Sequence, residues 1–186
     1  MKIYTKSGDK GKTSIIGGQR IYKSDLRVCA YGSIDEVNSW VGKVIAALDK
    51  ERFPSLSNEL TALQVLLFDI GTDLATPTGS KEMIVGQEDL AHIESLIDQY
   101  QSQVPVIEKF ILPGGHPIAC DLQVARTVIR RGEREVTALL IEEEINLIAY
   151  KIINRLSDLF FVLARYINSS YGIAEPFYER AGNVFH

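Results

Sequence analysis

The chain has 186 residues, of which 46% are hydrophobic and 24% are charged, a composition typical of one globular domain with a sizeable core. Its net charge of −4 disfavours a broad binding surface for nucleic acid, so any anion site must depend on local groups of cations. The sequence contains neither a stretch of eighteen apolar residues nor an apolar leader, which predicts a cytoplasmic protein without a membrane span. Its two cysteines, Cys29 and Cys120, have apolar-periodic surroundings, and we expect buried packing residues rather than a metal site.

The segment from Tyr4 to Ser14 is rich in Gly, Lys and hydroxyl side chains and precedes the first apolar-periodic stretch. Backbone N–H groups and cations at this density predict a phosphate-binding segment. Gly11-Lys12-Thr13 ends like a Walker A loop, but Lys6 occupies the position where that motif needs its first glycine. From the residues alone, a solvated and flexible N-terminal arm is the alternative.

Apolar residues at three- and four-residue spacing predict five helices. The first begins at Ser33, in a sequence with the form of a capping box, and ends near residue 49. The others cover residues 56–74, 90–100, 117–142 and 148–167. Residues 106–112 have the composition of a strand, but a single strand has no pairing partner, so we expect an extended connection. Short links between helices predict an all-α, five-helix antiparallel bundle.

The predicted helix over 117–142 carries Arg126, Arg130 and Arg134 on one face, because a four-residue step rotates the side chain by only ~40°. Such a stripe binds phosphates or carboxylates, and its alternative is an exposed face with ion pairs along the helix. The fifth helix carries polar residues from Asn154 to Asp158 within an apolar stretch, and buried polar groups need partners. A structural hydrogen-bond network is the alternative for these groups.

Six blocks of the sequence together resemble the PduO-type ATP:cob(I)alamin adenosyltransferases, the corrinoid adenosyltransferase family. The blocks occur in the order of the family and cover residues 4–11, 17–20, 31–36, 110–115, 125–134 and 154–165. Gln123 stands where the family often has a histidine, and we do not expect it to touch the chemistry. Residues 175–183 are only loosely similar to the family's C-terminal ending.

The resemblance implies a homotrimer with ATP bound between neighbouring subunits and the corrinoid above it. We expect a single domain over residues 1–186, with a nucleotide-binding segment over 1–24, the bundle over 25–172 and a C-terminal tail over 173–186. The resemblance assigns the nucleotide and its Mg²⁺ to ten residues: Thr5, Lys6, Ser7, Gly8, Thr13 and Lys23 contact the triphosphate side, and Arg130, Glu133, Arg134 and Asn154 hold the rest of the nucleotide and its Mg²⁺. It implies that Asp35 and Arg126 join adjacent subunits, and that Phe110 presses on the lower face of the corrin ring.

The implied reaction transfers the 5′-deoxyadenosyl group of ATP to the Co(I) of a reduced corrinoid and releases triphosphate. Co(I) is a strong nucleophile, so the protein must orient C5′ of ATP and stabilise the leaving triphosphate. Reduction to Co(I) becomes easier once the lower axial ligand is removed, and a bulky residue such as Phe110 can displace that ligand. The sequence has no redox-active cysteine motif or flavin fingerprint, so we expect a partner reductase to supply the electron.

Two other functional classes are weighed against this one. A ferritin-like metal-binding bundle needs Glu-x-x-His pairs, and none of the three histidines forms one. A non-catalytic bundle that binds nucleotide or corrinoid would have the same fold, but the joint presence of Arg126, Arg130, Glu133, Asn154 and Phe110 argues against it. We expect neither nucleic acid nor a membrane as a partner.

Overall fold

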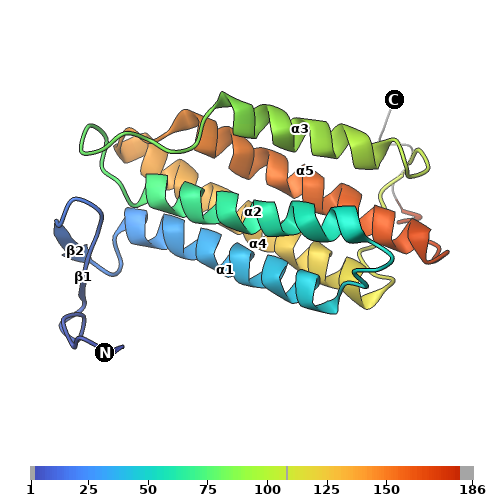
Figure 1. The fold of residues 1–186 in the computed structure, drawn as a ribbon, viewed down its shortest axis with the longest axis horizontal. Coiled ribbons are helices and arrows are strands. Elements are labelled where there is room, and N and C mark those ends of the chain that lie inside the picture. Colours follow the sequence, from blue (N-terminus) through green and yellow to red (C-terminus); the bar gives the residue numbers. More distant parts are fainter. Residues whose placement is uncertain (1–2, 108, 181–186) are drawn as a thin grey trace.

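The computed structural model describes residues 3–107 and 109–180, which form five long helices and one short β-hairpin (Figure 1). The elements are β1 (Lys12–Ser14), β2 (Arg20–Tyr22), α1 (Leu26–Ala47), α2 (Pro54–Leu74), α3 (Gln87–Gln101), α4 (Pro117–Glu142) and α5 (Leu147–Ser170). Helix α1 packs against α2 and α4, α4 packs against α5, and α5 packs against α3. Consecutive helices run in opposite directions, which confirms the predicted all-α bundle (Figure 1). None of the described helices is long and apolar enough to cross a membrane.

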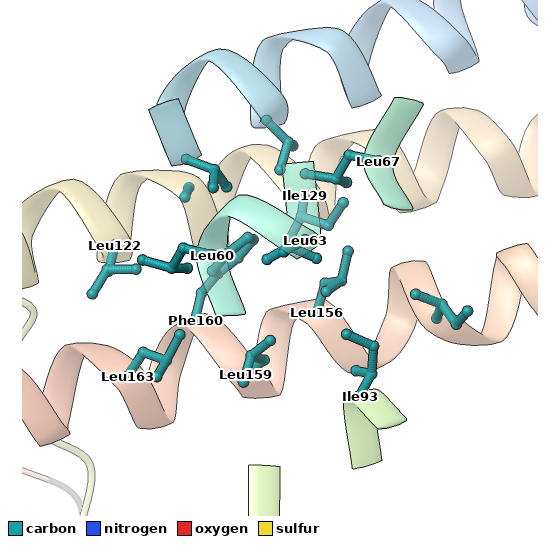
Figure 2. Close-up of a cluster of buried hydrophobic side chains, with 14 of the residues drawn as sticks. Leu60, Leu63, Leu67, Ile93, Leu122, Ile129, Leu156, Leu159, Phe160 and Leu163 are labelled. Carbon is teal, nitrogen blue, oxygen red and sulfur yellow. The ribbon is translucent and has the colours of Figure 1, made fainter. Parts of the chain in front are cut away.

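The core lies between the helices and consists of the apolar residues that recur at helical spacing (Figure 2). Leu60 and Leu67 of α2 meet Ile129 of α4 and Phe160 of α5, and all four are buried. Ile93 extends the same cluster to α3. Burial of one such side chain contributes roughly 1.5–3 kcal/mol to folding, so these stripes fix which face of each helix remains at the surface.

Helix α1 begins seven residues earlier than the predicted start at Ser33. Its N-cap is Asp25, whose carboxylate accepts a hydrogen bond from the backbone N–H of Arg27 at 3.0 Å. The first turn buries Arg27 instead of an apolar residue, and its guanidinium donates to the carbonyl of Leu74 at 2.5 Å and to Glu143 at 2.5 Å. A buried arginine does not contribute to an apolar pattern, which explains why the pattern placed the start too late.

The N-terminal segment contains a hairpin that the sequence did not predict. Strands β1 and β2 are antiparallel, and Thr13 pairs with Ile21. The turn between them uses Gly17 and Gly18, both with positive φ. Strands of three residues are too short to show an alternating apolar pattern in the sequence. Ile15, which is 8% exposed, anchors the turn in the protein.

The two cysteines do not occupy the buried positions expected for them. Cys29 is exposed on α1, and Cys120 is half-buried near the start of α4. Each lies next to a fully buried alanine, Ala30 and Ala119, so both are displaced by about 100° from the face that packs in the core.

The extended connection before α4 has a pairing partner, contrary to the prediction. Ile111 forms an antiparallel bridge with Phe177 of the C-terminal tail. The N–H of Leu112 donates to the carbonyl of Pro176 at 2.9 Å, and the N–H of Tyr178 donates to the carbonyl of Phe110 at 2.7 Å. The partner lies more than sixty residues later in the chain, so local sequence gives no signal of it. At this end of the bundle the tail lies beside the loop that joins α3 to α4 (Figure 1).

The loop enters α4 through a glycine that has no room for a side chain. Gly115 has φ +104, and a Cβ atom there would lie 2.2 Å from Oδ1 of Asn168. Asn168 is buried on α5, where its Oδ1 accepts from the N–H of His116 at 2.9 Å and its Nδ2 donates to the carbonyl of Gly114 at 3.0 Å. One amide therefore fastens both sides of the glycine to α5.

We predict that Gly115→Ala destabilises the protein by at least about 3 kcal/mol, because it combines an unfavourable φ with the loss of the Asn168 hydrogen bonds. Gly79→Ala is the matched control, since Gly79 also has positive φ (+78) but a Cβ atom added there would meet nothing within 4 Å. The control should cost only about 1–2 kcal/mol. Urea unfolding of the three proteins checks this, and equal losses in the two variants would contradict the role given to Asn168.

Candidate functional site

The arginine stripe forms on α4 as the sequence predicted. Arg130 and Arg134 are exposed, and Arg126 is half-buried. Nη1 of Arg134 donates to the carbonyl of Arg130 at 2.8 Å, and Nε of Arg126 donates to Oε1 of Gln123 at 2.7 Å. Gln123 is 7% exposed and holds the guanidinium of Arg126, so it supports a predicted site residue, and the expectation that it does not touch the chemistry stays a prediction.

Arg131, the neighbour of Arg130, points away from this stripe. Its guanidinium pairs with the carboxylate of Glu36 on α1. Adjacent residues on a helix differ by about 100° in direction, so Arg131 and Arg130 serve different surfaces.

A chain of hydrogen bonds joins α3, α5 and α4 beside the stripe. Nδ2 of Asn154 donates to Oε1 of Glu133 at 2.6 Å, and Nη1 of Arg155 donates to Oδ1 of Asn154 at 3.0 Å. Nε of Arg155 in turn donates to Oε1 of Glu94 at 3.1 Å. Arg155 thus fixes the orientation of the Asn154 amide and leaves the second carboxylate oxygen of Glu133 for another partner.

Burial and neighbouring charges shift the pKa values of two residues in this region. Burial lowers the pKa of the Arg126 guanidinium, and the positive charge of Arg130 lowers that pKa further. On α5, desolvation raises the pKa of Asp158, although Arg155 and Arg130 act in the opposite direction. Arg126 and Arg130 thus repel each other along α4, and an anion bound beside them would relieve that repulsion.

Phe110 and Arg126 line the same cavity, which has a volume of about 190 Å³. Phe110 is half-exposed, at 51%, and comes from the loop before α4. Phe161 of α5 and Gln123 of α4 complete the wall with Ile107, Ile111 and Pro113. The cavity is therefore apolar except where Arg126 and Gln123 border it, next to the first turn of the stripe.

The N-terminal segment gathers its predicted residues into a compact loop. The hydroxyls of Thr5 and Ser7 are hydrogen-bonded at 2.8 Å, and Lys6 has a φ of +60, which is unusual for a residue with a side chain. The Lys23 ammonium lies next to Gly8, since a Cβ on that glycine would be 3.1 Å from Nζ. Strain and clustered donors of this kind occur at ligand-binding loops.

Two further contacts fix this loop. Arg20, which belongs to the block of residues 17–20 but was given no role from the sequence, donates to the carbonyl of Ser7 at 2.5 Å. Thr13 forms a side-chain hydrogen bond with Tyr31 of α1, where burial raises the tyrosine pKa. The loop is thus attached to α1, and the hydrogen bonds and ion pairs of the described residues do not link residues 3–23 to α4.

Asp35 is exposed on α1 and borders a cavity of about 290 Å³ between α1 and α2. Phe68, which is 66% exposed, Tyr31 and Thr72 also line this cavity. Asp35 and Arg126 do not pair within the chain. The structure thus brings the predicted residues together in three places: the stripe with Glu133 and Asn154, the Phe110 cavity beside it, and the N-terminal loop.

The residues that sequence reasoning missed are those that hold the predicted ones. Gln123 holds Arg126, and Arg155 with Glu94 holds Asn154. Arg155 lies in the Asn154–Asp158 block, so its helical position gave a partial signal. Glu94 gave none, because its contact with α5 depends on how α3 packs.

Comparisons with known proteins find similar sequences over most or all of the chain. The profile of the family described as cobalamin adenosyltransferase matches residues 3–167. The corrinoid adenosyltransferase of Bacillus subtilis is 46% identical over 186 residues, which cover 100% of this chain and 96% of that protein. The human corrinoid adenosyltransferase is 39% identical over 185 residues, which cover 96% of this chain and 74% of that protein.

Solved structures of corrinoid adenosyltransferases are also similar to this chain over nearly its full length. A PduO-type ATP:corrinoid adenosyltransferase from Lactobacillus reuteri, a variant with a phenylalanine replaced by histidine, was solved in complex with cobalamin and ATP. It superposes with a TM-score of 0.94 at 48% identity, over 99% of this chain and 100% of that one. A variant of the same enzyme with an arginine replaced by lysine, complexed with ATP, has a TM-score of 0.89 at 47% identity over 95% and 99% of the two chains. This chain belongs to the cobalamin adenosyltransferase family.

Proposed function

We propose that the protein transfers the 5′-deoxyadenosyl group of ATP to the Co(I) of a reduced corrinoid. The observation that carries the proposal is that two different surfaces adjoin. The apolar cavity of Phe110 borders Arg126, and the proposed anion-binding stripe of α4 begins at the same residue. A planar apolar macrocycle and a polyphosphate chain need these two surfaces side by side. In the transfer, cobalt forms a bond to C5′, the C5′–O bond breaks, and its electron pair leaves with triphosphate.

Arg130 is proposed to hold the triphosphate, together with Thr5, Lys6, Ser7, Gly8, Thr13 and Lys23 of the N-terminal segment, and Arg134 is proposed to hold the rest of the nucleotide. Guanidinium groups bind phosphate oxygens in pairs of hydrogen bonds, and backbone N–H groups of a Gly-rich loop add further donors. Because negative charge accumulates on the leaving triphosphate, the same contacts strengthen in the transition state. Asn154, oriented by Arg155, serves the rest of the nucleotide.

Mg²⁺ fits this site through Glu133. The described residues contain no group of three or more His, Cys, Asp or Glu side chains that could hold a metal ion. Mg²⁺ bound to a nucleotide commonly takes only one or two carboxylates, with phosphates and water as its other ligands. The second oxygen of Glu133 is available for that role, because Asn154 donates to Oε1 only. The ion would supply charge neutralisation at the phosphates.

Phe110 is proposed to occupy the space below the corrin ring and to displace the lower axial ligand of cobalt. Half of its surface is exposed, and Phe161 lies across the same cavity. The chain's residues offer binding and orientation, so the electron that produces Co(I) is proposed to come from a separate reductase. We place the reaction in the cytoplasm.

The active form is proposed to be a homotrimer in which neighbouring subunits share each site. Within one chain the N-terminal segment has no hydrogen bond or ion pair to α4 among the described residues, although both are assigned to the same triphosphate. Phe68 is exposed, and a cavity lies beside Asp35 between α1 and α2. We propose that α4 of a neighbouring subunit docks on this face, so that its Arg126 pairs with Asp35. Closed cyclic symmetry repeats this contact around the ring.

A non-catalytic bundle that binds nucleotide or corrinoid is the second candidate, and turnover separates the two. The direct test is release of triphosphate when the protein is mixed with MgATP and chemically reduced cobalamin. We expect stoichiometric formation of adenosylcobalamin and repeated turnover. Binding of both ligands without triphosphate release would support the non-catalytic alternative.

We predict that inorganic triphosphate stabilises the protein through Arg130. At a hundredfold excess over its Kd, a ligand that binds only the folded state adds about 2.7 kcal/mol, or roughly 5–11 °C in Tm for a chain of this size. Arg130→Ala should remove most of that shift, because each charge-assisted hydrogen bond contributes about 1.5–3 kcal/mol. Arg131→Ala is the matched control and should keep the shift. Equal losses in the two variants, measured by thermal unfolding, would show that the stripe is assigned to the wrong face.

For Phe110→Ala we predict a loss that depends on the starting oxidation state of cobalt. Transfer to cobalamin supplied as Co(I) should persist, because that nucleophile has already lost its axial ligands. The route from cob(II)alamin with a reduced flavin should fall by at least about tenfold, together with the spectrum of four-coordinate Co(II). The ratio of the two rates in one preparation is the measurement. If both rates fell in parallel, Phe110 would be a packing residue.

The shared site predicts that Asp35→Arg dissociates the trimer and lowers activity by at least about tenfold, since it places two positive charges together. The double variant Asp35→Arg/Arg126→Asp should recover part of the assembly. Glu36→Gln is the control, because Glu36 pairs with Arg131 of its own chain. Light scattering reports the mass of each variant. A fully active monomer would overturn the proposal.

A further inference from the structure

The C-terminal tail and the Phe110 segment form one short antiparallel pair. Hydrogen bonds join Leu112 to Pro176 at 2.9 Å and Tyr178 to Phe110 at 2.7 Å, with the Ile111–Phe177 bridge between them. The second bond ends on the carbonyl of Phe110 itself. The position of the Phe110 backbone therefore depends on the position of residues 176–178.

The tail is in turn attached to the bundle through Glu175. Its Oε2 accepts from Nε of Arg165 at 2.9 Å, and its Oε1 accepts from Nδ2 of Asn168 at 3.3 Å. The Arg165 side chain is 6% exposed and that of Glu175 is 15% exposed, so the ion pair is largely shielded from water. A pair of this kind is costly to break, because the remaining partner stays buried without compensation.

The same two residues of α5 also hold the loop that carries Phe110. Nη2 of Arg165 donates to the carbonyl of Pro105 at 2.7 Å, before Phe110 in the chain. Asn168 binds Gly114 and His116 after it. Arg165 and Asn168 therefore fix both ends of the loop. Glu175 fixes the middle of the loop, because it holds the tail that pairs with residues 110–112.

We propose that Glu175 is a positioning residue for Phe110. It sets the tail against the bundle, the tail pairs with residues 110–112, and the pairing holds the Phe110 ring at the cavity that it shares with Phe161 and Arg126. The proposal rests on the proposed function in one respect, the displacement of the lower cobalt ligand by Phe110. The attachment of the loop by Glu175 does not depend on it.

A second ion pair between the same two segments provides an internal control. Nζ of Lys109 lies 4.0 Å from Oε2 of Glu179, and these side chains are 37% and 79% exposed. Exposed pairs contribute little, because water and salt screen them. Glu179→Gln thus removes a carboxylate from the same tail without removing the buried attachment.

The first experiment is hydrogen exchange of the full chain with Glu175→Gln, Glu175→Ala and Glu179→Gln. We expect the amides of Leu112 and Tyr178, which donate the two bonds of the pair, to exchange at least about tenfold faster in both Glu175 variants. Glutamine keeps one acceptor oxygen, so its effect should be the smaller of the two. Core amides such as that of Leu156 and the Glu179→Gln protein should match the parent. Unchanged exchange at Leu112 and Tyr178 would overturn the proposal.

The second experiment measures transfer from cob(II)alamin with a reduced flavin and from chemically reduced cobalamin. We expect Glu175→Gln to lower the ratio of the first rate to the second at least about threefold, with an unchanged KM for ATP, in the direction of Phe110→Ala. A parent-like ratio despite faster exchange would show that the tail does not position Phe110. If the parent itself failed to transfer the adenosyl group, the proposed function would be wrong, and the exchange result would still decide what Glu175 does.

Discussion

The packing of α4 between α1 and α5 is the constraint on which the rest of the structure depends. Gly132 lets α4 approach α1 so closely that a Cβ atom there would lie 3.2 Å from Cβ of Ser33. Val136 and Ile129 bury the faces on either side. With two sides of the helix packed in the core, Arg126, Arg130 and Arg134 lie together on the face that remains. The packing of α4 therefore decides which surface of the bundle carries the stripe.

Helical periodicity predicted the fold well because the bundle depends on apolar stripes. Leu60, Leu67 and Phe160 lie where their spacing placed them, and the ends of α4 and α5 agree with the prediction within a few residues. The errors occur where structure depends on something other than an apolar pattern. Arg27 is buried through hydrogen bonds to carbonyls, and β1 and β2 are defined by glycines in a turn, so neither was visible.

The residues of the candidate site also divide into those that spacing predicted and those that it did not. Arg126, Arg130 and Arg134 could be placed on one face from spacing alone, since a helix converts sequence separation into direction. The contact of Gln123 with Arg126 also follows one helical turn, but nothing in the sequence distinguished it from a surface contact. Glu94, Arg165 and Glu175 act across distances that only packing determines. Supporting residues are therefore harder to predict than the residues that they support.

The pairing of Ile111 with Phe177 also has a consequence for the order in which the protein is made. A ribosome completes the five helices before it adds residues 176–178, which lie against the Phe110 loop, so the loop waits for these residues. Domains generally fold as units during synthesis, and here the core belongs to the bundle, whereas the Phe110 loop is completed by residues 176–178. A nascent chain from which residues 176–178 have not yet emerged can therefore have a folded bundle and an unsupported loop. Emergence of these residues, rather than formation of the core, sets the moment at which the loop acquires its final shape.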